Sequence, residues 1–471
     1  MKLTDWTVIL GAPVASAKII GAVVYGRHGD RTPKAMGSPE LTILGRNQMF
    51  SAGDYHHNRY ISNSSDYYLD GIDATENLTQ YMSATNIGGS AVLFDSATTF
   101  NQALFPKVAD ESITLVNGSE YSDPMDGIQY VSLFAAAPGS SDFVYLDGNN
   151  DCPAWTTASK SYLQSESFKA TNASTAEFYA GFKDLIQSLN PKTSVKYNYG
   201  GAYDVFDILN YGMNHIASVA DQVTEEEYFQ LRTLADTYSW NLIYNESQPL
   251  RGIAGRTMLA QIQDQISAIA ANSGSNRKLA FIAGSYDTIQ SGWFLMNIPQ
   301  KNPGFYAIPD YAATMVFEVH ESDSGDLTVQ FGYRNTTLGE GAEYEMIPVF
   351  DFDSVDMDYT TFMNKMNDVT LNDISEWCTQ CDAWSLDICA STKTLQDTQA
   401  QLSALQTSTD DELSAAAGGG IGAGVTIGVF AIAGVLFYLF RRNKKSAALS
   451  KETLPVVERA MSESTKGSTL G

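Results

Sequence analysis

The sequence predicts an α/β fold in which a sheet built from both ends of the globular region carries a large helical insertion. Three observations support this prediction. Residues 19–25 form an apolar, β-branched run, which is typical of a strand covered on both faces. Residues 108–272 are mostly helical in pattern, and strand patterns return after Lys278. The chain has 471 residues, 44% of them hydrophobic, so it can bury a core of this size.

The amino terminus has the pattern of a secretory signal peptide. Residues 1–17 contain one lysine, the apolar stretch WTVILGAPVA, and a small-x-small cleavage site at Ala15-Ser16-Ala17. We therefore predict that the mature ectodomain begins near Lys18 and extends over residues 18–390.

A second apolar segment predicts one C-terminal transmembrane helix. Residues 415–440 contain no charged side chain, and a helix needs roughly 20 apolar residues to cross the hydrocarbon core of a bilayer. The basic run RRNKK follows directly, and positive charge marks the cytoplasmic flank of a span. The prediction is a single-pass type I protein of the cell surface with an extracellular ectodomain, a Ser/Thr-rich stalk at 391–414 and a cytoplasmic tail at 441–471.

The cysteines and sequons fit an outer, oxidising compartment. All four cysteines precede the predicted span: Cys152, Cys378, Cys381 and Cys389. Disulfides form outside the cytosol, so we expect two bridges, with three connectivities open. A zinc site at the C-x-x-C pair is less favoured, because the other cysteines are not spaced as in a zinc ribbon. Six sequons on the same side predict a glycoprotein: Asn63, Asn77, Asn117, Asn172, Asn245 and Asn335.

Local patterns predict the individual elements of the ectodomain. Thr42 is expected to cap the helix that follows the first strand. The segment 108–272 is interpreted as an α-helical insertion or cap. KLAFIAGSYDT then predicts a strand, and residues 312–321 and 327–335 alternate as a hairpin across the turn Ser-Asp-Ser-Gly-Asp.

One histidine lies between two arginines at the end of the first strand. The stretch GRHGDRTP places Arg27, His28 and Arg31 where open α/β sheets hold their sites. A neutral imidazole can attack an electrophile, and flanking guanidiniums lower its pKa and supply bidentate donors for a phosphoryl group. Phosphoryl transfer through a phosphohistidine uses all three groups. The alternative is that the arginines are surface charges and the histidine has no chemical role.

This stretch resembles a known signature. RHGDRTP resembles the Arg-His-Gly-x-Arg-x-Pro motif of the histidine acid phosphatases, the second clade of the histidine phosphatase superfamily. ELTILGRNQ, DSATTFNQALFP and PDYAATMVFEV resemble further segments of that family, so that the resemblance covers about residues 19–389. It implies a phosphoglycerate mutase-like fold, with a mixed central sheet flanked by helices and an α-helical cap.

The resemblance also implies roles for individual residues. His28 would be the nucleophile, Arg27 and Arg31 the phosphate clamps, and Asp287 the proton donor to the leaving oxygen. An acidic optimum would follow, because an unperturbed aspartic acid titrates near pH ~3.9. Asp30 would lie close by without a fixed role. No metal and no cofactor is predicted.

Two positions depart from the family pattern. Val92 stands where the family places an arginine, and Tyr286 stands where it has the histidine of a His-Asp pair. The Tyr286 hydroxyl is expected to donate to a phosphate oxygen in place of that histidine. Other histidines are not expected to substitute: His56 and His57 are predicted on the surface, and His320 within a strand.

Three functions remain open. The first is an extracellular acid phosphatase that hydrolyses phosphate monoesters, with activity reduced by the two departures. The second is a catalytically inactive pseudophosphatase that serves as a cell-surface binding or structural glycoprotein, and the third is a phytase-like inositol polyphosphate phosphatase.

Charge and spacing define the expected partners. The formal net charge of −25 disfavours nucleic acid, so the expected partners are a small phosphorylated substrate and the membrane. Three span glycines spaced four residues apart permit a homodimer: Gly420, Gly424 and Gly428.

Overall fold

The computed structural model describes residues 17–72, 80–88, 91–109, 112–191, 193–271, 274, 277–335 and 343–409. Nearly all of the predicted signal peptide, and all of the predicted span, its glycines and the cytoplasmic tail, lie outside these ranges. Within them, no helix combines the length and the apolar character that crossing a bilayer requires.

The sheet is mixed, as predicted, and contains eight strands. The order is β10-β8-β7-β1-β6-β2-β5, with β9 paired to β8. β1 lies next to β6 in parallel and next to β7 in antiparallel orientation, so residues from both ends of the ectodomain form its centre. The strands are β1 (Lys18–Arg27), β2 (Tyr81–Asn86), β5 (Phe134–Ala136), β6 (Leu279–Gly284), β7 (Thr314–Glu321), β8 (Leu327–Arg334), β9 (Glu345–Met346) and β10 (Met357–Asp358). The predicted hairpin is confirmed, because β7 and β8 pair from Thr314↔Arg334 to Glu321↔Leu327.

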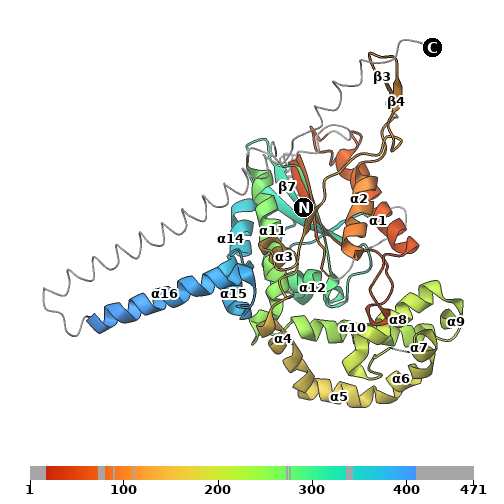
Figure 1. Ribbon diagram of the computed structural model, residues 1–471, viewed down its shortest axis with the longest axis vertical. Helices are drawn as coiled ribbons and strands as arrows, with labels where there is room; N and C mark the ends of the chain where they lie inside the picture. Colours follow the sequence, from red (N-terminus) through yellow and green to blue (C-terminus); the bar gives the residue numbers. More distant parts are fainter. Residues whose placement is uncertain are drawn as a thin grey trace, which may run out of the picture. The chain divides into compact units, whose positions relative to one another are not determined.

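Helices cover both faces of this sheet, which explains why β1 is apolar throughout. Val23 and Tyr25 point to one face and pack with α11 (Ile253–Ala270) and α14 (Tyr359–Val369). Ala22 and Val24 point to the other face and pack with α1 (Ile43–His56) and α2 (Val92–Leu104). In Figure 1, α1 and α2 lie on one side of the sheet and α11 on the other.

The first helix begins as predicted, but the histidine at its end is buried and not exposed. The Thr42 hydroxyl accepts a hydrogen bond from the backbone N–H of Gly45 at 2.9 Å, so it caps α1. His56 is fully buried, which corrects the prediction of a surface position. Its Nδ1 donates to the Ala52 carbonyl at 2.6 Å, and its Nε2 lies 2.6 Å from the Tyr344 hydroxyl. Burial lowers its pKa to about 3, so the ring stays neutral. His57, in the π-helical turn His57–Ile61, is half-buried and donates from Nδ1 to the Leu104 carbonyl.

The helical insertion begins later than residue 108. Residues 112–136 hold three short strands, β3 (Ser112–Thr114), β4 (Glu120–Ser122) and β5, and helices follow from Ser141. They are α3 (Ser141–Leu146), α4 (Pro153–Lys160), α5 (Glu166–Ser174), α6 (Ala176–Gly181), α7 (Lys183–Leu189), α8 (Ala202–His215), α9 (Ala217–Ala220), α10 (Glu225–Ile243) and α11. Residues of α6 to α10 share a core of their own, with Tyr179, Tyr199, Ile208 and Leu231 buried in it, whereas α11 packs on the sheet.

The remaining helices carry the disulfides and the start of the predicted stalk. They are α12 (Tyr286–Leu295), α13 (Ile298–Lys301), α14, α15 (Ile374–Cys381) and α16 (Asp387–Thr409). The two bridges are Cys152–Cys381 and Cys378–Cys389, which selects one of the three connectivities. Residues 391–409 of the predicted stalk belong to α16, so this part of it is helical.

A buried ion pair ties the end of α1 to the sheet. Arg59 donates from Nε to Glu318 Oε1 at 2.9 Å, and the Tyr60 hydroxyl donates to the same oxygen. Glu318 is fully buried and Arg59 is 6% exposed. Arg59→Met should lower the free energy of unfolding by about 3–5 kcal/mol, because it removes the guanidinium that lies 2.8 Å from the buried Glu318 carboxylate.

Urea unfolding would measure this loss. The double variant Arg59→Met/Glu318→Met is the control, and it should be more stable than the single variant because it removes both charges. Equal stability of the single variant and the wild type would contradict the assignment.

Candidate active site

A cavity of about 290 Å³ opens where β1, β2 and β6 end. Strands that run in parallel bring the residues after their carboxyl ends to one edge of a sheet, so distant segments meet there. The cavity is lined by residues from each of these strand ends and from α2 and the turn after α3, among them His28, Arg31, Lys34, Asn86, Val92 and Asp147.

Two glycines set the path of the chain at the nucleophile. A Cβ on Gly29 would lie 2.3 Å from the Gly45 carbonyl oxygen, and a Cβ on Gly45 would lie 2.1 Å from the Asp30 carbonyl oxygen. Only glycine allows the first turn of α1 to pack this closely on the loop. The Gly29 N–H also donates to the Ser96 hydroxyl of α2 at 3.3 Å. The loop is therefore fixed by both helices on that face.

His28 is held as a neutral imidazole. Its Nδ1 lies 2.8 Å from the Gly29 carbonyl oxygen. A carbonyl can only accept, so Nδ1 carries the proton and Nε2 keeps its lone pair. Burial lowers the pKa of His28 well below its usual value, and the charges of Arg27 and Arg31 lower it further. The ring can thus act as a nucleophile at acidic as well as neutral pH.

Arg31 is buried and tied to the helical insertion. Its Nη1 donates to Asp207 Oδ2 of α8 at 2.9 Å, and its Nη2 donates to the Tyr203 hydroxyl at 3.1 Å. Among the described residues, its buried Nε has no hydrogen-bond partner. One donor of this guanidinium is therefore available to an anion in the cavity.

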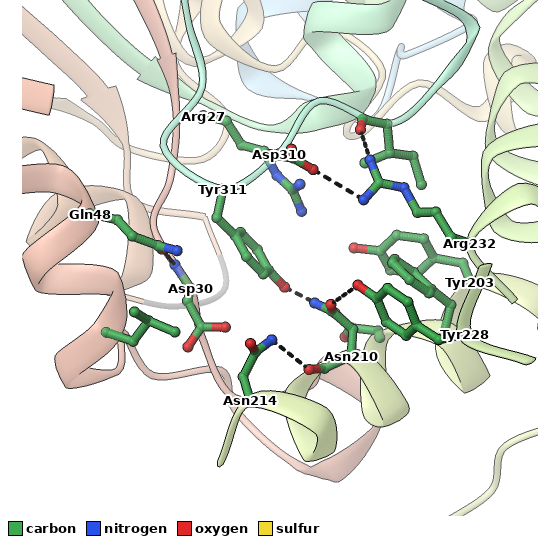
Figure 2. Close-up of a pocket in the computed structure, with 14 residues that line it drawn as sticks. Arg27, Asp30, Gln48, Tyr203, Asn210, Asn214, Tyr228, Arg232, Asp310 and Tyr311 are labelled. Atoms are coloured by element: carbon green, nitrogen blue, oxygen red, sulfur yellow. Dashed lines mark hydrogen bonds and ion pairs between the residues drawn. The ribbon is translucent and has the colours of Figure 1, made fainter. Parts of the chain in front are cut away.

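Arg27 lies in a second, smaller cavity of about 170 Å³ and not among the residues that line the first. Its Nη1 donates to the Pro309 carbonyl, and its guanidinium carbon lies 4.2 Å from the ring centre of Tyr311 and 5.2 Å from that of Tyr286. Figure 2 shows the Arg27 guanidinium beside Tyr311 and close to Asp310. From the sequence, Arg27 was expected to hold the phosphoryl group together with Arg31, one on each side of His28.

Tyr286 and Asp287 begin α12, directly after β6. The Tyr286 ring stacks on Tyr203 with 5.0 Å between ring centres, so it faces the helical insertion. Asp287 Oδ2 accepts a hydrogen bond from Asn149 Nδ2 at 3.3 Å. Neither residue is among those that line the His28 cavity.

Asp30 has defined partners, although sequence assigned it no role. Its Oδ2 lies 2.6 Å from Nε2 of His215 and accepts from the Thr42 hydroxyl, while its backbone N–H donates to Gln48 Oε1. His320 lies within β7, as predicted. It pairs with Ile19, at the end of β1 that is far from His28.

Sequence reasoning missed five polar residues of the cavity: Lys34, Asn86, Asp147, Asn150 and Ser285. Lys34 and Asn86 had a signal, since Lys34 follows RHGDRTP directly and Asn86 ends β2 at the same edge as His28. Asp147 lies in the turn Asp-Gly-Asn-Asn and had no signal beyond turn composition. Burial raises its pKa to about 7, and the nearby charge of Asp287 contributes.

Comparison with solved structures identifies the fold. A phytase from Hafnia alvei in its apo form superposes with a TM-score of 0.53 at 12% identity, covering 79% of this chain and 99% of that chain. The chain has the fold of these phytases. A phytase from Citrobacter braakii gives a TM-score of 0.52 at 12% identity, with 78% and 99% covered. The Hafnia alvei phytase in complex with myo-inositol hexakis sulphate gives 0.51 at 13% identity, with 76% and 98% covered.

The similarity lies in the fold alone, because identity to these phytases is so low. The sequence matches no protein-family model, and it is similar to no curated protein sequence. The expected fold, a mixed central sheet flanked by helices, is confirmed.

Proposed function

We propose that this chain is an extracellular, membrane-anchored phosphomonoesterase that works through a phosphohistidine on His28. The observation that carries the proposal is the state of His28, a buried neutral imidazole with an unprotonated Nε2 in a cavity shared with Arg31 and Lys34. A nucleophile beside fixed positive charge is what transfer of an anionic phosphoryl group needs.

The reaction has two steps. Nε2 attacks phosphorus, the P–O bond to the alcohol breaks, and a carboxylic acid of the site, by the resemblance Asp287, gives its proton to the leaving oxygen. Water then attacks the phosphohistidine and gives a proton to the carboxylate left by the first step, while the P–N bond breaks and its electron pair returns to Nε2. Arg31 holds the phosphoryl oxygens, and Arg27 and Tyr286 join it when the Arg27 guanidinium leaves the Pro309 carbonyl.

A second candidate is a catalytically inactive surface glycoprotein, and the position of Arg27 favours it. Its guanidinium is engaged by a carbonyl and an aromatic ring, and Val92 supplies no charge in its place. Phytase-like action on inositol polyphosphates ranks third, because Val92 leaves the cavity without one arginine that would help to hold a polyanion.

Phosphoenzyme trapping tests the proposal. The full chain in detergent, quenched during turnover of a ³²P-labelled aryl phosphate at pH 5, should carry label in an acid-labile, alkali-stable form. His28→Ala protein should carry none, and Asp142→Asn protein, changed at an exposed residue of α3, should carry as much as the wild type. Binding of phosphate without any trapped label or turnover would favour the second candidate instead.

A further inference from the structure

The turn after α3 carries a second carboxyl group into the site. Asp147 is half-buried and lines the cavity together with His28, Arg31 and Lys34. Asp287 is not among the lining residues. Of the two carboxyl groups, Asp147 is therefore the one that faces a bound substrate.

Three contacts hold this turn in place. A Cβ on Gly148 would lie 2.3 Å from Thr257 Oγ1, so only glycine allows the turn to pack on α11. Trp377 Nε1 of α15 donates to the Gly148 carbonyl at 2.8 Å, and the Cys152–Cys381 disulfide fixes the end of the turn to the same helix. A turn anchored this firmly can keep a side chain in a productive position.

The charges around Asp147 favour its protonated form. Asp287 and Asp151 both raise its pKa, burial does so most, and Lys34 and a hydrogen bond with Asn150 lower it. Asn149 connects the turn of Asp147 to Asp287. It follows Asp147 by two residues, and its Nδ2 donates a hydrogen bond to Asp287 Oδ2 at 3.3 Å. The negative charge of Asp287 therefore helps to keep the proton on Asp147.

We propose that Asp147 is a further catalytic residue, which delivers a proton to the leaving oxygen, while Asp287 acts behind it as a positioning residue. This inference rests on the proposed phosphatase function. As Nε2 of His28 bonds to phosphorus and the ester P–O bond breaks, the Asp147 proton moves to the leaving oxygen. The resulting carboxylate then accepts a proton from the water that attacks the phosphohistidine.

Leaving groups of different basicity test this role. An alkyl phosphate such as glycerol 2-phosphate needs a proton on its leaving oxygen, whereas 2,4-dinitrophenyl phosphate expels a stable anion without one. Asp147→Asn should lower kcat on glycerol 2-phosphate about 10²- to 10⁴-fold and kcat on the dinitrophenyl ester less than about 10-fold. Asp142→Asn is the matched control, because this exposed residue of α3 does not line the cavity and should leave both rates unchanged.

The pH profile separates Asp147 from Asp287. Asp287→Asn removes the neighbouring negative charge, which lowers the pKa of Asp147, so the alkaline limb of kcat on glycerol 2-phosphate should move to lower pH. Asp147→Asn should abolish that limb.

The outcomes distinguish the two proposals. Equal loss on both esters, or none on glycerol 2-phosphate, in an otherwise active protein would overturn the role of Asp147 alone. Absence of wild-type turnover on both esters would overturn the phosphatase function itself, and the role of Asp147 with it.

Discussion

His28→Ala is expected to lower kcat for an aryl phosphate by about 10⁴- to 10⁶-fold. The phosphohistidine route then closes, because no other imidazole lines the described cavity. Removing the nucleophile of a covalent mechanism typically has an effect of this order. Arg31 and Lys34 remain, so phosphate should still bind, and the loss should appear in kcat more than in KM.

The control is His57→Ala, which changes a half-buried histidine outside the cavity. It should keep kcat within about threefold of the wild type. If His28→Ala and His57→Ala had equal rates, the nucleophile would have to be another group.

His28→Ala should also lose less stability in acid than the wild type does. His28 in the folded protein resists protonation, whereas the unfolded chain takes up the proton below pH ~6.5. The wild type therefore loses stability as the pH falls below that value, by up to about 1.4 kcal/mol per pH unit from this group. Urea unfolding at pH 7 and pH 4.5 should show a smaller loss for His28→Ala.

Val92→Arg is expected to raise kcat/KM for the same ester by about 10- to 100-fold. Val92 is the first residue of α2, is 2% exposed and lines the His28 cavity. An arginine there would place a guanidinium in the cavity, where a preorganised donor to a developing charge contributes about 10² to 10³ in rate. Desolvation of the new charge offsets part of this gain.

Val92→Met is the matched control, because it adds length without charge. A rate for Val92→Arg no higher than for Val92→Met would contradict the expectation. The new positive charge should also lower the pKa of Asp147 and move the alkaline limb to lower pH. Kinetics from pH 4 to 8 would measure both effects.

Local signals predicted the elements whose causes are local. The apolar run of β1, the Thr42 cap and the alternation of β7 and β8 each depend on residues within one turn or one hairpin. β3 and β4 were missed because each is three residues long and exposed, so no periodicity marks them.

The motif predicted those parts of the site that depend on the path of the backbone. It did not predict side-chain positions that depend on residues far along the chain. The position of His28 follows from its strand, but Arg27 turns toward Pro309 and Tyr311, which lie far along the chain. His56 is buried for the same reason, because its Tyr344 partner is 288 residues away. Single-sequence patterns carry no information about such contacts.

The central place of β1 has a consequence for biosynthesis. β1 ends at Arg27 and its neighbour β7 ends at Glu321, about 290 residues later. A ribosome adds roughly 5–20 residues per second, so the earliest strand waits about 15–60 s for its second neighbour. Contacts of such large sequence separation slow folding, and an unpaired apolar strand is prone to aggregate meanwhile. The sheet can therefore close around β1 only after β7 has been synthesised.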